Sequence, residues 1–155
     1  MARLQTPEKT SVKASTPKEL ESLIRSMYEH FNDHDLDKLS AMFADDCEWL
    51  EVPTGRVFRG PDGAREFDGG WMEAFPDARI EVTNLLCQGD MVVTEFIGRG
   101  THGGPLKGAS GSIPATNKRV ELRLMDVFQF RGKQIMRART YYDALTMLRQ
   151  IGAVE

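Results

Sequence analysis

The spacing of hydrophobic residues changes near residue 75, and this change restricts the fold more than any other feature. Over most of the chain before residue 75, apolar side chains recur every three or four residues, as on one face of a helix. After it, apolar and polar residues alternate, as in half-buried strands. Helices followed by antiparallel strands predict an α+β fold in which helices cover one face of a sheet.

Local signals place the elements. The first helix is expected from a capping box that joins Thr16 to Glu19, with Pro17 at the first helical position. A short second helix carrying Leu36, Leu39 and Phe43 is expected next, then a third after Gly60. A short last helix is expected after Asp143, which is suited to cap it. The expected strands lie at residues 48–52, 80–85, 92–101, 120–130 and 135–142.

Length and composition predict one small soluble domain. The chain has 155 residues, with 41% hydrophobic and 28% charged residues, an ordinary globular mixture. Residues 1–15 have little to bury and are expected to form a mobile tail before a domain at 16–155. A net charge of −3 gives no reason to expect nucleic acid or a membrane surface as partner. The N-terminal residues lack a signal-peptide core, so the cytoplasm is expected, and the scattered histidines predict no metal site.

One carboxylate interrupts the apolar face of the longest expected strand. Every second residue from Val120 to Phe130 is apolar except Asp126. An unpartnered charge there would cost several kcal/mol, so Asp126 is expected to be hydrogen-bonded, protonated or directed into a cavity. Two interpretations remain open: a structural carboxylate, for instance paired with Arg139, or a residue that lines a pocket.

Three further residues are candidates for a site. Trp49 and Glu51 lie on one side of a short strand, where they could form the floor of a ligand site or be core and surface residues. His102 ends a strand next to two glycines, and histidine is the most common acid–base residue. It could equally be a histidine of a surface loop.

Five segments of the chain carry a resemblance to a known family: Phe75-Pro76-Asp77, Gly100-Thr101-His102-Gly103-Gly104, residues 113–118, Asp126-Val127-Phe128-Gln129-Phe130 and residues 142–152. They resemble the SnoaL-like polyketide cyclases and ester cyclases of the nuclear transport factor 2-like superfamily. Residues 35–46 resemble the ketosteroid isomerases of the same superfamily. The resemblance spans about residues 18–153. It implies a cone-shaped, strongly curved antiparallel sheet, three helices from the N-terminal half over its concave face, and a homodimer formed through the outer face.

The resemblance also implies roles for individual residues. In a ketosteroid isomerase an Asp base moves the proton, while a protonated Asp and a Tyr hold the oxyanion. Glu51 aligns with the base and Asp126 with the protonated acid, whereas Met27 occupies the tyrosine position. Tyr28, Tyr142 or His102 would then have to replace that donor.

Other positions depart from the enzymes of the superfamily. Thr140 stands where cyclases and limonene epoxide hydrolases place an acidic residue. Phe96 and Gly98 stand where the epoxide hydrolases have an arginine and an aspartate.

These observations predict an internal pocket for a small apolar molecule and no cofactor. The expected chemistry is acid–base isomerisation or aldol-type cyclisation of an apolar carbonyl compound by Glu51, Asp126 and His102. The pocket would be shaped by Trp49, Met27, Phe96, Phe128, Thr140 and Tyr142. A protein that binds such a ligand without converting it is the alternative. In either case Leu23, Met27 and Phe31 should face the sheet.

Overall fold

A computed structural model describes residues 12–108 and 110–155. Four helices and eight strands follow one another along the chain. The helices are α1 (Pro17–Asn32), α2 (Leu36–Ser40), α3 (Gly60–Ala74) and α4 (Ala144–Gln150). The strands are β1 (Phe43–Glu51), β2 (Arg56–Arg59), β3 (Arg79–Gln88), β4 (Met91–Thr101), β5 (Leu106–Gly108), β6 (Gly111–Ile113), β7 (Arg119–Arg131) and β8 (Gln134–Tyr142).

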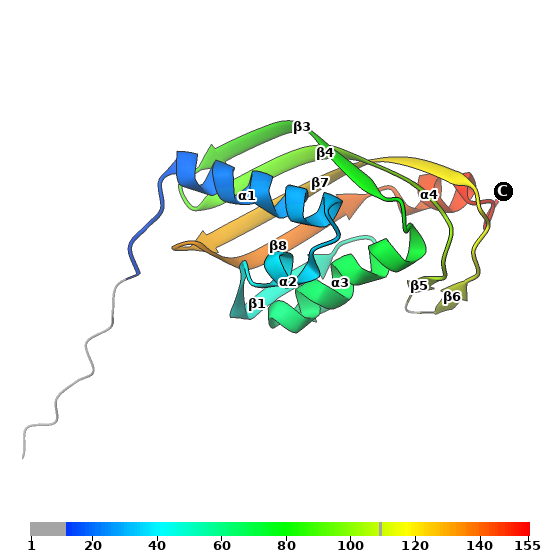
Figure 1. Cartoon of the computed structure of the whole chain (residues 1–155), viewed down its shortest axis with the longest axis horizontal. Helices are drawn as coiled ribbons and strands as arrows, with labels where there is room; N and C mark the ends of the chain where they lie inside the picture. The colour runs from blue at the N-terminus through cyan, green and yellow to red at the C-terminus, as the bar shows by residue number, and fades with distance from the viewer. Residues whose placement is uncertain (1–11, 109) are drawn as a thin grey trace, which may run out of the picture.

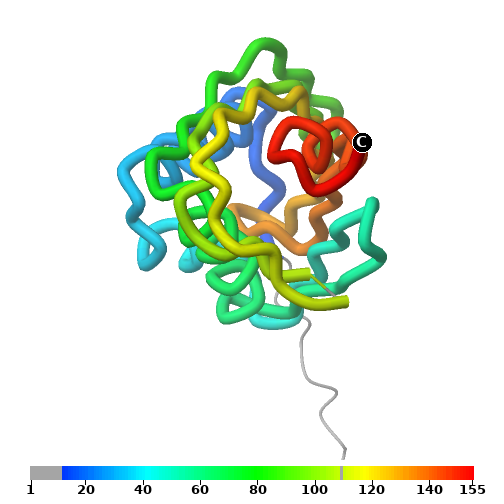
Figure 2. Tube along the Cα trace, turned by 90° about the vertical axis from the view of Figure 1, so that its right-hand side faces the viewer, coloured from blue at the N-terminus to red at the C-terminus, as the bar shows by residue number. Residues whose placement is uncertain are grey.

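A six-stranded sheet in the order β2-β1-β8-β7-β4-β3 forms one layer of the protein. All neighbouring strands run antiparallel except β1 and β8, which are parallel. The ladder is irregular in β1, β3 and β8, and such bulges increase the local bend and twist of a sheet. The sheet curves around the interior, as the end-on trace shows (Figure 2).

Helices α1, α2 and α3 lie side by side over the concave face of this sheet (Figure 1). The predicted capping box of α1 is present: Thr16 accepts from the amide of Glu19, whose side chain accepts from the amide of Thr16. Met27 and Phe31 are buried against the sheet and Leu23 is partly buried, as the helical stripe predicts. The expected α+β architecture, with its curved sheet and short C-terminal helix, is confirmed.

Three details differ from the sequence-based expectations. Phe43 begins β1 instead of ending a second helix, because α2 stops at Ser40 and the next residues pair with β8. Strand β2, which pairs with β1, is not predicted from the sequence, because its four residues follow the turn around Gly55 and are too few to show a strand pattern. The segment between the strands expected at 92–101 and 120–130 contains the small β5–β6 hairpin, which the sequence does not predict because its glycine and serine content is not typical of strands.

The sequence makes predictions for both the segment before α1 and the start of α4. Most of the tail expected at residues 1–15 lies outside the described residues; residues 12–16 have no regular secondary structure, although the Ser15 hydroxyl donates to the carbonyl of Gly132 at 2.9 Å. At the other end Asp143 caps α4 by accepting from Thr146, as predicted.

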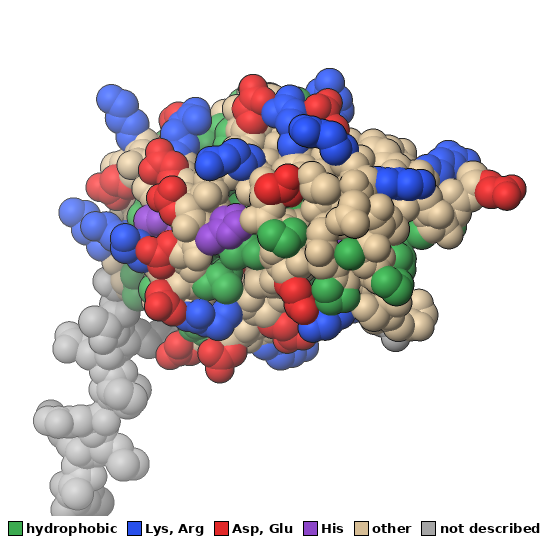
Figure 3. Space-filling view, turned by 45° about the vertical axis from the view of Figure 1, so that its right-hand side comes forward, with side chains coloured by type: hydrophobic (Ala, Val, Ile, Leu, Met, Phe, Trp, Pro, Cys, Tyr) green, Lys and Arg blue, Asp and Glu red, His purple; other side chains and the backbone are tan. Residues whose placement is uncertain are grey.

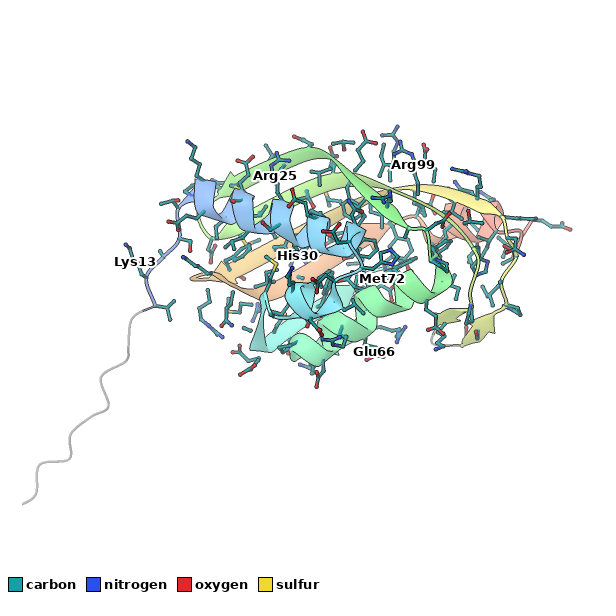
Figure 4. The ribbon with its side chains drawn as sticks, in the orientation of Figure 1. Lys13, Arg25, His30, Glu66, Met72 and Arg99 are labelled. Atoms are coloured by element: carbon teal, nitrogen blue, oxygen red, sulfur yellow. The ribbon has the colours of Figure 1, made fainter. Side chains whose placement is uncertain are left out.

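The surface carries mixed charge. Acidic and basic side chains alternate over the face shown in Figure 3, without a large field of one sign. Arg99 illustrates the pattern on the outer side of β4 (Figure 4), where it pairs with Glu81 and Glu121. Within the described residues no helix is both long enough and apolar enough to span a membrane.

Candidate functional site

A cavity of about 90 Å³ lies between the helices and the concave face of the sheet. Its walls are mostly apolar and come from all four helices and from β1, β3, β4, β7 and β8. Gly98 and Gly100 of β4 help to form the cavity, because glycine has no side chain to fill the space beside the strand. A Cβ atom on Gly98 would lie 3.3 Å from Leu124, and one on Gly100 would lie 3.0 Å from Phe75. Larger residues at these positions would therefore crowd the cavity wall.

Asp126 is the polar centre of the sheet side of this cavity. Register places Thr94 of β4 and Thr140 of β8 directly opposite it. Thr140 donates to Oδ1 of Asp126 at 2.6 Å, and Tyr28 of α1 donates to Oδ2 at 2.7 Å. Thr94 in turn donates to the hydroxyl of Tyr28, and Trp49 donates from Nε1 to the hydroxyl of Thr140 at 2.9 Å. Hydrogen bonds thus fix both oxygens of a carboxyl group that is only 3% exposed.

Burial and hydrogen bonding act on Asp126 in opposite directions. Desolvation disfavours the charged form and is the larger effect, while the hydrogen bonds from Thr140 and Tyr28 favour that form. The net result raises the pKa of Asp126 from 3.8 to about 6. A carboxyl group with this pKa is mostly ionised at neutral pH and is a much stronger base than an exposed aspartate. Arg139, the partner considered from the sequence, is exposed and does not contact it.

A second carboxyl group, Asp68 of α3, lines the same cavity. It is 6% exposed, and its Oδ2 is buried with no hydrogen-bond partner among the described residues. Burial, together with the charge of Asp126, raises the pKa of Asp68 well above its usual value. The cavity therefore holds two acidic groups in different surroundings: one is held by hydroxyl donors, and the other has no partner on its buried oxygen.

The residues predicted to shape the pocket fall into two groups. Trp49, Met27, Phe96 and Thr140 line the cavity together with Asp126. Phe128 is fully buried but lies behind the cavity wall, where its ring packs against Tyr28 and Trp49.

Glu51 and Tyr142 lie in a different place from the one expected. They line a wider, more polar cleft of about 830 Å³, bounded by α3, the β5–β6 hairpin and α4. Glu51 is 6% exposed and accepts hydrogen bonds from Tyr142 at 2.7 Å and from Thr54 at 2.6 Å. Phe67, Trp71 and Met147 line both spaces and separate them. The structure thus brings Asp126 together with Asp68, and Glu51 together with Tyr142.

His102 reaches neither space. Its side chain is fully buried, and Nδ1 is 2.9 Å from the hydroxyl of Thr116. The ring packs beside Phe75, and burial lowers its pKa. The backbone of His102 also holds the loop through its bonds to Thr116, Asn117 and Lys118. This position favours a role in fixing the chain after β4.

The sequence contains a signal for Asp68 that is easy to overlook. Ala64, Phe67, Asp68 and Trp71 follow the spacing of one helix face, so a carboxylate occupies the middle of an inward stripe. The exposed Glu66 and the core-packed Met72 mark opposite sides of α3 (Figure 4). Tyr28 is harder to place, because it is adjacent to Met27 and only the packing of α1 shows that both point inward.

Within residues 12–108 and 110–155, no three His, Cys, Asp or Glu side chains are grouped so that they could hold a metal ion.

Comparisons with known proteins agree with this architecture. A search of curated proteins gave no match. The structure is similar to a candidate SnoaL-like polyketide cyclase from Jannaschia sp. CCS1, with a TM-score of 0.78 and 19% identity over 92% of this chain and 99% of that one. It is also similar to AclR, a candidate hydroxylase from Streptomyces galilaeus, with a TM-score of 0.77 and 18% identity over 90% of this chain and 100% of that one.

A third similar structure is IdmH, a candidate polyketide cyclase from Streptomyces antibioticus. Its TM-score is 0.70, with 27% identity over 85% of this chain and 97% of that one. The sequence model of the SnoaL-like polyketide cyclases matches residues 22–151, which is most of the chain. The protein therefore belongs to the SnoaL-like polyketide cyclase family.

Proposed function

We propose that the protein is a cofactor-free acid–base enzyme that cyclises or isomerises an apolar carbonyl compound. The observation that carries this proposal is Asp126, a buried carboxyl group with a pKa raised to about 6 in a mostly apolar cavity. Perturbed carboxyl groups in apolar cavities are typical of proton-transfer sites. Family membership supports the same reaction class.

Asp126 is the base in this proposal. Its free lone pairs accept a proton from the carbon next to the ligand's carbonyl group, and the electrons of the C–H bond form an enolate. In a cyclase this carbon then attacks a second carbonyl of the same molecule. In an isomerase, Asp126 returns the proton to another carbon. Tyr28 and Thr140 hold the carboxyl in place and act as positioning residues.

The dimensions of the site suggest how a ligand fits. A volume of about 90 Å³ is small beside the several hundred Å³ of sites for drug-sized molecules. The cavity suits one ring, or one end of a longer molecule. A longer ligand would extend past Trp71 into the cleft, where Glu51 and Tyr142 offer hydrogen-bonding groups to its polar end. In this arrangement Glu51 binds substrate and does not take the proton.

Exchange of carbon-bound hydrogen tests the proposal without knowledge of the natural substrate. In D₂O the protein should accelerate loss of the α-proton signals of 2-tetralone, an apolar ketone, as followed by proton NMR. Because general bases contribute roughly 10²–10⁴-fold to rate, Asp126→Asn should lower the rate at least about 100-fold. Glu95→Gln, which changes an exposed carboxylate on the outer side of β4, is the matched control. The rate should rise with pH around the pKa of about 6.

The alternative is a protein that binds a ligand without converting it. Protein donors already occupy both oxygens of Asp126, which favours this reading. It predicts saturable binding of 2-tetralone with no exchange above the rate of buffer alone. Exchange that survives Asp126→Asn but is lost in Glu51→Gln would contradict the role given to Asp126.

A further inference from the structure

Asp68 has no function in the scheme above, yet its environment is costly to maintain. Its buried Oδ2 has no hydrogen-bond partner in the described part of the chain, and an unsatisfied buried polar atom is rare in proteins. It lies in the apolar stripe of α3 between Phe67 and Trp71, where a leucine would bury more apolar surface. Because Asp68 lines the cavity, a ligand bound there can supply the missing hydrogen-bond partner.

The two carboxyl groups approach the cavity from different layers of the protein. Asp68 comes from α3 in the helical layer and Asp126 from β7 in the sheet (Figure 1). Both line the cavity, and the charge of Asp126 acts on Asp68. A flat molecule between the layers would have one carboxyl group on each side.

Their surroundings divide the roles. Hydroxyl groups donate to Asp126 and stabilise its charged form. No hydrogen-bond donor of the described residues reaches the buried oxygen of Asp68. Two arginines, Arg79 and Arg99, also line the cavity. Arg99 is paired with Glu81 and Glu121 on the outer side of the sheet, and the side chain of Arg79 is exposed. Hydroxyl donors stabilise the charged form of one carboxyl group and not that of the other, and such a difference in surroundings can divide the roles of base and acid between two carboxyl groups.

We propose that Asp68 is a second catalytic residue, whose carboxyl group donates a hydrogen bond and then a proton to the ligand's carbonyl oxygen. This inference rests on the proposed acid–base function. As Asp126 takes the proton from the adjacent carbon, the C–H electrons form the C=C bond and the carbonyl π electrons form the O–H bond. An enol results, with Asp126 protonated and Asp68 ionised, so the total charge of the site is unchanged. In an isomerisation, Asp126 gives its proton to another carbon and the enol O–H proton returns to Asp68. In a cyclisation, the enol carbon attacks a second carbonyl, Asp126 protonates the new alkoxide oxygen, and the enol O–H proton returns to Asp68, so both routes restore the site.

Three molecules of nearly the same shape distinguish this role from others. Acetophenone carries a carbonyl oxygen, α-methylstyrene replaces it with CH₂, and 1-phenylethylamine replaces it with an ammonium group. Their affinities are measured by calorimetry or NMR for the wild type, Asp68→Asn and Asp68→Leu. An amide can still donate a hydrogen bond, whereas leucine cannot.

The ratio of acetophenone affinity to α-methylstyrene affinity is the quantity that matters. One hydrogen bond is worth roughly a fivefold to tenfold change in affinity. We expect the ratio to fall by that factor in Asp68→Leu and to stay within about threefold of wild type in Asp68→Asn. Affinity for α-methylstyrene should change little, which also shows that the variants are folded. If Asp68→Leu does not fold, carboxyl-carbon NMR of the wild type replaces it: acetophenone should shift the Asp68 signal, and α-methylstyrene should not.

Several results would overturn the inference. These are an unchanged ratio in Asp68→Leu, tighter binding of the amine than of the ketone by the wild type, or no saturable binding of any of the three at millimolar concentration. The amine result would identify the pair as a site for a cation. Failure of the proposed function is a separate result, because it appears as unaltered 2-tetralone exchange in Asp126→Asn.

Discussion

Thr140 shows how much a single hydroxyl group contributes to the site. It accepts from Trp49 and donates to Asp126, so it links two residues from different strands. We expect Thr140→Val to raise the pKa of Asp126 above about 6, because the bond from Thr140 is one of the two that lower it. The free energy of unfolding should fall by about 1–3 kcal/mol, since two buried polar groups lose their partner.

Chemical denaturation and carboxyl-carbon NMR measure the two effects of Thr140→Val. Thr83→Val, at an exposed threonine that donates to the carbonyl of Glu95, is the control and should change neither quantity by much. An unchanged pKa of Asp126 would mean that the hydroxyl of Thr140 does not support its charge.

Some residues of the candidate site can be predicted from the sequence, and others cannot. Asp126 is recognisable because a charge interrupts an apolar strand face, a purely local pattern. Its partners are not, because Thr94 and Thr140 meet it only through the register of three strands. Glu51 shows the same limit of sequence-based prediction. The alternation of residues correctly places it on the same side of β1 as Trp49, but it does not reveal that Glu51 lines a separate cleft.

At the scale of elements, α3 holds Asp68 in place and is also locally weak. Gly69 and Gly70 lie inside the helix, and glycine destabilises a helix interior by about 1 kcal/mol relative to alanine. A Cβ atom on Gly70 would meet nothing within 4 Å. The helix could be predicted from its stripe of apolar residues, whereas the space around each glycine depends on packing.

Gly70→Ala should therefore raise the free energy of unfolding by roughly 0.5–1 kcal/mol. Gly63→Ala is the matched contrast in the same helix: its Cβ would lie 2.8 Å from the backbone of Phe58, so it should destabilise the protein. Denaturant titration of both variants measures the difference. Equal effects of the two substitutions would contradict the packing of α3 against β2.

At the scale of the whole molecule, buried acids make stability depend on pH in an unusual direction. Asp126 binds its proton more tightly in the folded chain, with a pKa of about 6 against 3.8. The folded state therefore holds more protons than the unfolded state between these values, and stability falls as pH rises through this window. The difference corresponds to about 3 kcal/mol for this group. Asp68 acts in the same direction.

Asp126→Asn should flatten this decline. Unfolding free energies of wild type and variant, measured from pH 4 to pH 7.5, should differ most in their slope, with the wild type losing more stability. Parallel curves would contradict a raised pKa for Asp126.

The outer face of the sheet offers a surface for a second copy. A shallow groove there is lined by Leu50, Val57 and Val127, with Arg137 and Arg139 beside them. We expect sedimentation to give a homodimer at micromolar concentration, and Val127→Lys to produce monomers while the fold is kept. A monomer for the wild type would contradict this assembly.

The central claim is that Asp126 is a proton-transfer group, and its titration tests that claim most directly. Carboxyl-carbon NMR of the wild type, assigned with Asp126→Asn, should show a midpoint of about 6. The midpoint should be unaffected by Glu51→Gln, because Glu51 lies in the separate cleft. A midpoint at or below 3.8, the value of an ordinary aspartate, would contradict the account and identify Asp126 as a structural carboxylate.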